Sequence, residues 1–186
     1  IEATAVVPEG RISYADVGLY DDATEAAMAR VLAGVRRWSD MPIAIQLAHA
    51  GRKASTDKPW AGGAQIAPGH PNGWQTVAPS PIPFYPDGPA IPTPAELDIS
   101  GIEKIKDDFH KATRRAKKIG YDVLEIHAAH GYLLHQFYSP LSNQRKNAYG
   151  GSFENRIRLL LETTEIVRKE WGPDKPLFVR ISATEW

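Results

Sequence analysis

The chain has 186 residues, of which 42% are hydrophobic and 24% charged, which is ordinary for one soluble globular domain. Lys plus Arg and Asp plus Glu are both 22, so the charge balance gives no reason to expect nucleic acid or an anionic membrane as a partner. The absence of cysteine excludes disulfides, thiolate metal sites and cysteine nucleophiles from this chain.

Neither a membrane span nor a signal segment is indicated by the sequence pattern. No apolar run approaches the roughly 20 residues of a membrane span, and no signal segment opens the sequence, so we expect a cytoplasmic setting. The chain opens on Ile1 and closes soon after an apolar run, and we therefore expect it to be an internal part of a longer protein.

Strand and helix patterns alternate along the chain. Four short apolar segments are predicted as strands, at 1–7, 42–47, 121–126 and 177–181. Three segments with apolar residues every three or four positions are predicted as helices, at 22–38, 100–119 and 153–171. This alternation predicts a parallel sheet, either doubly wound or closed into a barrel. No G-x-G-x-x-G motif follows a strand, so the dinucleotide-binding fingerprint of doubly wound folds is missing.

Each predicted helix has an apolar side that we expect to face the core. In the first helix, which Asp22 or Thr24 would cap, this side comprises Met28, Val31, Leu32, Val35 and Trp38. In the second it comprises Ile102, Ile105, Phe109, Ala112, Ala116 and Ile119. In the third it comprises Ile157, Leu160, Leu161, Thr164 and Val167. The charged side of the second helix is predicted to face solvent.

Residues 48–98 are rich in proline and glycine and are predicted to form a long structured loop. A linker is the plainer interpretation of such a composition. However, the segment carries four large aromatic residues, which would pack onto other parts of the protein: Trp60, Trp74, Phe84 and Tyr85. We therefore expect a loop folded over a site.

Polar residues interrupt three of the predicted strands. Gln46, His127 and Arg180 each stand where an apolar residue would be expected. Singly, each would more often satisfy backbone groups, and Arg180 would pair with a carboxylate such as Glu125 or Glu2. Together they are predicted to converge, because the carboxyl ends of parallel strands share one edge of a sheet. An amide, an imidazole and a guanidinium could hold a planar heteroaromatic ring that bears carbonyls and an acidic nitrogen.

A second group of functional side chains follows the third predicted strand within the segment 120–151. His127, His130 and Tyr132 lie within six positions, where the chain turns toward the next helix. The two histidines could also bind a metal, but no zinc-binding spacing is present and we predict no metal site.

Three stretches of the chain resemble a known family: QLAHAGRKA at 46–54, LEIHAAHGYLLHQFYSPLSNQRKNAYGGSFENR at 124–156, and FVRIS at 178–182. They resemble the old yellow enzyme family, and within it the bacterial xenobiotic reductase branch. The resemblance runs over the full length of the chain. It implies a (β/α)8 TIM barrel with FMN at the carboxyl ends of its strands, of which this chain is similar to about strands 3 to 6.

The resemblance also implies roles for individual residues. Gln46 would bind the pyrimidine edge of the flavin, Arg180 would lie near N1 and the C2 oxygen, and the backbone of Ala3 would touch the ring. His127 and His130 would donate hydrogen bonds to the substrate oxygen, and Tyr132 would donate the proton. Many family members carry asparagine where His130 stands, which keeps a nitrogen donor.

The implied activity is that of an ene-reductase. NADPH or NADH would reduce FMN, and hydride transfer from FMN would reduce the C=C bond of an α,β-unsaturated carbonyl, with nitro compounds as a further substrate class. We expect the whole protein to be a homo-oligomer. The family's first two strands and last two strands, with the FMN phosphate site, have no counterpart in this chain. The competing interpretation is therefore that the isolated chain is a non-catalytic half-barrel that binds FMN poorly. A flavin-free barrel lyase or metal hydrolase is a third candidate.

Overall fold

The computed structural model describes residues 1–84 and 93–185. Four parallel strands form the main sheet, in the spatial order β1 (Thr4–Ala5), β2 (Ala44–Ala48), β5 (Val123–Ala128) and β6 (Leu177–Ile181). The order in space follows the order along the chain without a reversal. A doubly wound sheet reverses its order at a switch point, so the observed order favours a segment of a barrel.

Three long helices connect the strands, and their ends carry capping residues. They are α1 (Asp22–Arg36), α2 (Ile99–Ile119) and α4 (Phe153–Trp171). Asp21 caps α1 through a capping box with Thr24, so the predicted caps one and three residues later were wrong. Gly120 ends α2 at φ 92°, a left-handed conformation that favours glycine.

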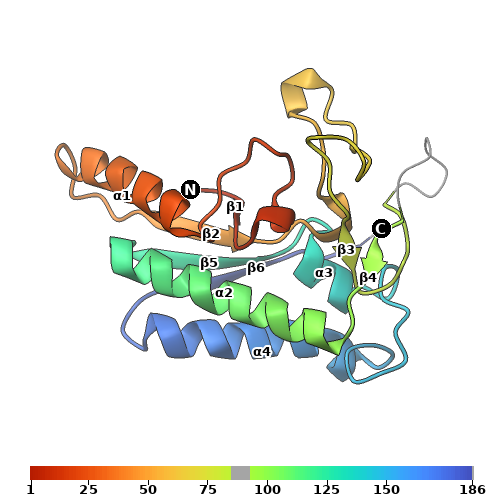
Figure 1. Cartoon of the computed structure of the whole chain (residues 1–186). Helices are drawn as coiled ribbons and strands as arrows, with labels where there is room; N and C mark the ends of the chain where they lie inside the picture. Colours follow the sequence, from red (N-terminus) through yellow and green to blue (C-terminus); the bar gives the residue numbers. More distant parts are fainter. Residues whose placement is uncertain (85–92, 186) are drawn as a thin grey trace.

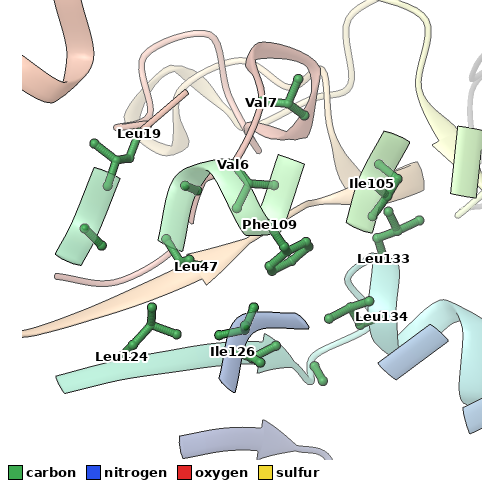
Figure 2. Close-up of a cluster of buried hydrophobic side chains, with 14 of the residues drawn as sticks. Val6, Val7, Leu19, Leu47, Ile105, Phe109, Leu124, Ile126, Leu133 and Leu134 are labelled. Carbon is green, nitrogen blue, oxygen red and sulfur yellow. The ribbon is translucent and has the colours of Figure 1, made fainter. Parts of the chain in front are cut away.

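The core lies between these helices and one face of the sheet. Helix α2 packs between α1 and α4, and Figure 1 shows α2 and α4 side by side along the strands. Figure 2 shows Phe109 of α2 in a cluster with Leu47 and Ile126 of the sheet and with Leu133 and Leu134 beyond β5. All five side chains are buried, which removes apolar surface from water and holds the helix layer on the sheet.

Some predicted helix faces differ from the structure. Helix α2 buries the predicted residues, with Ile119 partly exposed, but Val31 and Val35 of α1 are exposed and Trp38, beyond its end, is 89% exposed. In α4 the buried residues are Leu159, Thr163, Val167 and Trp171, whereas Leu161 is exposed. The charged side of α2 is not wholly solvated either, since two of its members, Lys106 and Asp108, are buried. Lys106 pairs with Glu103 and Glu162, and Lys104 pairs with Asp108.

Short elements that the sequence pattern did not predict gather beyond the carboxyl ends of the strands. They are η1 (Pro8–Gly10), η2 (Gly51–Lys53), η3 (Pro59–Ala61), β3 (Val77–Ala78), β4 (Ala95–Glu96) and α3 (Leu133–Tyr138). Figure 1 shows β3, β4 and α3 together at the right-hand end of the sheet. Strands β3 and β4 pair in parallel and form a separate small sheet.

The aromatic residues of the long loop behave differently from one another. Trp74 donates from its indole nitrogen to the Glu9 carbonyl at 2.8 Å, so it packs onto the segment after β1. Phe84 lies beside Lys53, whose ammonium is 4.8 Å from the ring centroid. Trp60 is 80% exposed, so the prediction that it packs is wrong. Tyr85 lies outside the described residues. Within the described part of the chain, no helix has the length and apolar character to cross a membrane.

Candidate active site

The polar residues that interrupt the strands face away from the helices. Successive side chains of a strand point to opposite faces of the sheet. Leu124 and Ile126 of β5 are buried in the core under the helices, so Glu125 and His127 point to the opposite face. Register places Gln46 beside Glu125, and Arg180 beside His127. The strand pattern alone therefore brings four polar side chains to one surface.

A chain of hydrogen bonds connects this surface across the sheet. The Gln46 side chain accepts from the backbone N–H of Ala3 at 2.8 Å and donates to the Glu125 carboxylate. Arg180 donates from Nε to the same carboxylate oxygen at 3.0 Å. These hydrogen bonds thus connect the residue before β1 with side chains on β2, β5 and β6. Glu125 accepts a hydrogen bond only from Nε of Arg180. The terminal guanidinium nitrogens of Arg180 have no hydrogen-bond or ion-pair partner among the described residues.

His127 is a buried, neutral hydrogen-bond donor. It is 4% exposed, and its Nδ1 accepts the backbone N–H of Ala129 at 3.2 Å, so the proton of the neutral ring is on Nε2. Burial, together with the electrostatic influence of His130 and Arg180, lowers the pKa of His127 to about 4. Near neutral pH the Nε2–H group is therefore available to an acceptor oxygen.

The turn after β5 holds His130 and Tyr132 around this imidazole. The rings of His130 and Tyr132 lie edge-on to His127, with centroids 5.0 Å and 4.9 Å away. His130 has φ 58°, a conformation that is uncommon for a residue with a side chain. Its backbone N–H donates to Ser182 Oγ at 3.0 Å, and its carbonyl accepts from Lys53 at 2.9 Å. These two bonds fix the turn from both sides.

Tyr132 precedes α3, and its hydroxyl stays protonated near neutral pH. Burial raises the pKa of the Tyr132 phenol, and the negative charge of Asp16 raises it further. The Lys53 ammonium lies 4.9 Å from the centroid of the Tyr132 ring. A phenol with a raised pKa can act only as a proton donor until it has delivered its proton.

One cavity of about 260 Å³ unites these residues. Its wall contains all six residues that the sequence indicated, together with Glu2 and Ile12: Ala3, Gln46, His127, His130, Tyr132 and Arg180. Ala3 has φ 40°, so two of the three non-glycine residues with positive φ in the described chain line this cavity. Strained backbone of this kind is often found where a ligand is held. The roles of the six residues in binding and catalysis stay predictions.

Sequence reasoning missed several residues of the site. The sequence indicated Glu125 as a possible partner for Arg180, and the structure shows that it also accepts from Gln46 and so orients both. Its alternation with Leu124 and Ile126 could have placed it beside Gln46. Lys53 ends the three-residue helix η2 and Ile12 lies in a loop, and neither segment is long enough or regular enough for periodicity to give a signal. No group of three or more histidine and carboxylate side chains in residues 1–84 and 93–185 could hold a metal ion.

The residues of the cavity wall offer two sets of groups. Gln46 offers an amide with both donor and acceptor capacity, and Arg180 offers a fixed positive charge with forked donors, which together fit a planar ring with several heteroatoms. His127, His130 and Tyr132 offer ring N–H and phenol donors to a second, smaller group that carries an acceptor oxygen.

Comparison with known proteins places the chain in one family. The model of the NADH:flavin oxidoreductase / NADH oxidase family matches residues 1–186. An NADH:flavin oxidoreductase of Gibberella zeae is 46% identical over 186 residues, which are 100% of this chain and 45% of that protein. An NADPH dehydrogenase of Geobacillus thermodenitrificans is also 46% identical, over 100% of this chain and 48% of that protein. The chain spans about half the length of the curated relatives that it matches.

Solved structures show the same relation. Morphinone reductase superposes with a TM-score of 0.79 at 33% identity, over 97% of this chain and 48% of that one. An old yellow enzyme from Pichia sp. AKU4542 superposes with a TM-score of 0.81 at 30% identity, over 97% of this chain and 45% of that one. These neighbours are (β/α)8 barrels, which confirms the prediction of a partial barrel. The chain belongs to the NADH:flavin oxidoreductase / NADH oxidase family, the FMN-linked oxidoreductases that include the old yellow enzymes.

Proposed function

We propose that the protein of which this chain is part is an FMN-dependent ene-reductase. It reduces the C=C bond of α,β-unsaturated carbonyls, and nitro compounds form a second substrate class. The observation that carries this proposal is the single cavity whose wall holds two kinds of groups. Gln46 and Arg180 are flavin-type anchors, which we call the flavin end, and His127, His130 and Tyr132 are oxyanion-type and proton donors, which we call the substrate end. Bound FMN would supply the hydride, and the residues of this chain would bind, orient and protonate.

Gln46, Arg180 and the backbone of Ala3 would hold the pyrimidine edge of the flavin. Glu125 prepares this end by fixing the Gln46 amide and the Nε edge of Arg180. The terminal guanidinium nitrogens are then directed by the same ion pair and can donate to ring oxygen and nitrogen acceptors. Arg180 would also place a positive charge where the reduced ring carries negative charge, which favours the reduced cofactor.

His127 and His130 would donate hydrogen bonds to the carbonyl or nitro oxygen of the substrate. Negative charge gathers on this oxygen as the β-carbon accepts the hydride, and donors fixed before the reaction stabilise that charge. Tyr132 would then deliver a proton to the α-carbon, which completes the saturation of the double bond. The neutral state of His127 suits this role, because its Nε2–H donates without requiring a buried positive charge.

A nicotinamide dinucleotide would reduce the cofactor. Some relatives are named for NADH and others for NADPH, so we propose both as reductants. The purified full-length protein is expected to be yellow, to lose its colour when NADPH or NADH is added without oxygen, and to regain it with 2-cyclohexenone. A full-length protein that is colourless and contains no flavin would contradict the proposal.

The 186-residue chain by itself is expected to be a non-catalytic half-barrel that binds FMN poorly. Strand β6 is an edge of the described sheet, and its Phe178 and Ile181 are 57% and 60% exposed. Arg180, on the same strand, is half exposed, so solvent would compete for its hydrogen bonds. Titration of the isolated chain with FMN would test this point: flavin fluorescence quenching at low-micromolar affinity would contradict it.

A homo-oligomer and a cytoplasmic location complete the proposal. Exposed apolar residues on and beside α1, including Val31, Trp38 and Met41, could be covered by further protein surface. Light scattering of the full-length protein, with the mass expected to be a multiple of the subunit mass, would test the assembly. A monomeric mass would refute that part of the proposal.

A further inference from the structure

A second cavity, of about 270 Å³, adjoins the candidate active site. Ile12 lines both cavities, so they share a wall. Apolar surface in the second cavity comes from Ile12, Pro59 and Phe84, and its polar wall includes Lys53, Thr56 and Gln65. An apolar cavity of about 150 Å³ is enough to hold benzene, so this one has room for a substituted six-membered ring.

The second cavity meets the substrate end of the site and not the flavin end. Lys53, which lines it, stands over the Tyr132 ring and donates to the His130 carbonyl. Neither Gln46 nor Arg180 contributes to its wall. A substrate held by His127 and His130 could therefore extend past Tyr132 into this space.

The charged groups of the cavity favour an uncharged occupant. Asp16 accepts from the backbone N–H groups of Ile12 and Ser13 and from Ser13 Oγ, and Asp57 accepts from Tyr14 and from the backbone of Lys58. These two carboxylates are therefore engaged in hydrogen bonds with nearby loop residues, but their negative charge still disfavours the binding of an anion. Lys53 disfavours a cation, and burial and the charge of Arg52 lower the pKa of its ammonium.

We propose that this second cavity is a specificity subsite that takes an uncharged, ring-sized apolar substituent on the α-carbon of the enone. The α-carbon is the relevant position because Tyr132, its proposed proton donor, lines the first cavity and contacts Lys53, which lines the second. This inference rests on the proposed ene-reductase function, and it adds a preference for α-substituted substrates.

Filling the subsite would test the proposal. In the full-length holoenzyme, Thr56→Phe adds a ring to the cavity wall, while the control Thr56→Val removes the same hydroxyl, which donates to the Ile12 carbonyl at 3.1 Å, without adding bulk. We expect Thr56→Phe to lower kcat/KM for 2-phenyl-2-cyclohexenone by about tenfold or more, with a change of less than about twofold for 2-cyclohexenone. Thr56→Val should change both substrates equally.

A second filling variant and a binding measurement complete the test. Pro59→Phe, with Pro59→Ala as control, fills the cavity from an exposed position and should reproduce the selectivity even if Thr56→Phe fails to fold. Binding of saturated 2-phenylcyclohexanone, followed through the flavin absorbance, should weaken in the filled variants while binding of cyclohexanone does not. Equal effects of the filled variants on both substrates would contradict the subsite inference but not the proposed function. The same conclusion would follow if the wild-type enzyme reduced 2-cyclohexenone but not its 2-phenyl derivative. A wild-type holoenzyme that reduces neither would refute the proposed function as well.

Discussion

The two ends of the site cavity are built in different ways. At the flavin end, Gln46, Glu125 and Arg180 stand on three adjacent strands and join in one run of hydrogen bonds. At the substrate end, His127 stands on β5 beside Arg180, but His130 and Tyr132 lie on the turn that follows this strand, and His130 has a left-handed backbone. Side chains on paired strands are fixed by the sheet, whereas those on the turn are fixed by a few contacts from other loops.

Because of this difference, we expect substitutions at the two ends to have different effects. A change at the flavin end would disturb the partners on neighbouring strands, since Glu125 links Gln46 to Arg180. The rings at the substrate end contact one another, and Tyr132 also contacts Lys53, but within the described residues no hydrogen bond joins these side chains to Gln46 or Arg180. We therefore expect variants of the flavin end to change cofactor affinity, and variants of the substrate end to change the rate of substrate reduction.

Removal of the Tyr132 hydroxyl should give the largest effect on rate. General acid catalysis typically contributes about 10²–10⁴-fold, and we expect Tyr132→Phe to slow the reoxidation of the reduced full-length enzyme by 2-cyclohexenone within this range. The FMN content should stay the same, because the hydroxyl is not at the flavin end. Stopped-flow absorbance of the flavin measures the rate, and an unchanged rate would assign the proton to another donor.

Buried histidines should make stability depend on pH. Burial lowers the pKa values of His49 and His127 to about 4, while an unfolded histidine titrates near 6.5. Below pH 6.5 the unfolded chain binds protons that the folded chain excludes, so this stability is fully present above pH 6.5 and is lost as the pH falls toward 4. Each histidine contributes about 3 kcal/mol to this loss in the free energy of unfolding.

Urea unfolding of the full-length protein at several pH values between 7 and 4 would measure this loss. His127→Asn removes one of the two titrating groups and should reduce the pH dependence by about half of the histidine contribution, or about 3 kcal/mol. If wild type and variant lose stability in parallel, then His127 has the same pKa in the folded and the unfolded chain, which would contradict its burial as a neutral ring.

Loss of the Arg180 guanidinium should weaken FMN binding. A hydrogen bond to a charged group contributes about 1.5–3 kcal/mol, so Arg180→Met should raise the FMN dissociation constant about 10–100-fold. Arg180→Lys keeps the positive charge beside Glu125 and should lose less. Flavin fluorescence titration of the apoenzyme measures both constants. Equal FMN affinity of wild type and Arg180→Met would contradict the assignment of Arg180 as a flavin-binding residue.

Asparagine should replace His130 with the smallest loss. Asparagine tolerates the left-handed backbone better than most residues and offers an N–H donor, whereas alanine keeps neither advantage. We expect reduction of 2-cyclohexenone by His130→Asn to stay within about tenfold of wild type and His130→Ala to fall below it by about a further tenfold. Similar kcat/KM values for the two variants would mean that His130 is not a donor to the substrate.

The sequence predicted the features that depend on local pattern. Helix α4 and strand β6 have the predicted bounds, and Gly120 ends α2 as expected. Alternation within strands brought Gln46, His127 and Arg180 to one edge, because parallel strands impose a shared direction on their side chains. The position of His130 and Tyr132 just beyond a predicted strand also marked them as candidates, and the resemblance to the family supplied Ala3 and the individual roles.

The features that sequence pattern could not predict depend on packing partners. Periodicity in α1 marks positions that could be buried, but α1 packs chiefly against α2, so Val31 and Val35 stay exposed. Helix α3 and strands β3 and β4 are too short to have a periodic signal. Lys53 reaches the site from the three-residue helix η2, and only the three-dimensional structure shows its contacts with Tyr132 and His130.

The division of the cavity into a flavin end and a substrate end is tested most directly by one rate. Full-length wild type and His127→Ala, each reduced without oxygen, would be mixed with 2-cyclohexenone, and the return of the flavin absorbance would be followed. We predict equal flavin content and a reoxidation rate about 10²–10³-fold lower in His127→Ala, the loss typical of a removed oxyanion donor. Reoxidation at the wild-type rate, or loss of FMN from the variant, would contradict the assignment of His127 to the substrate end.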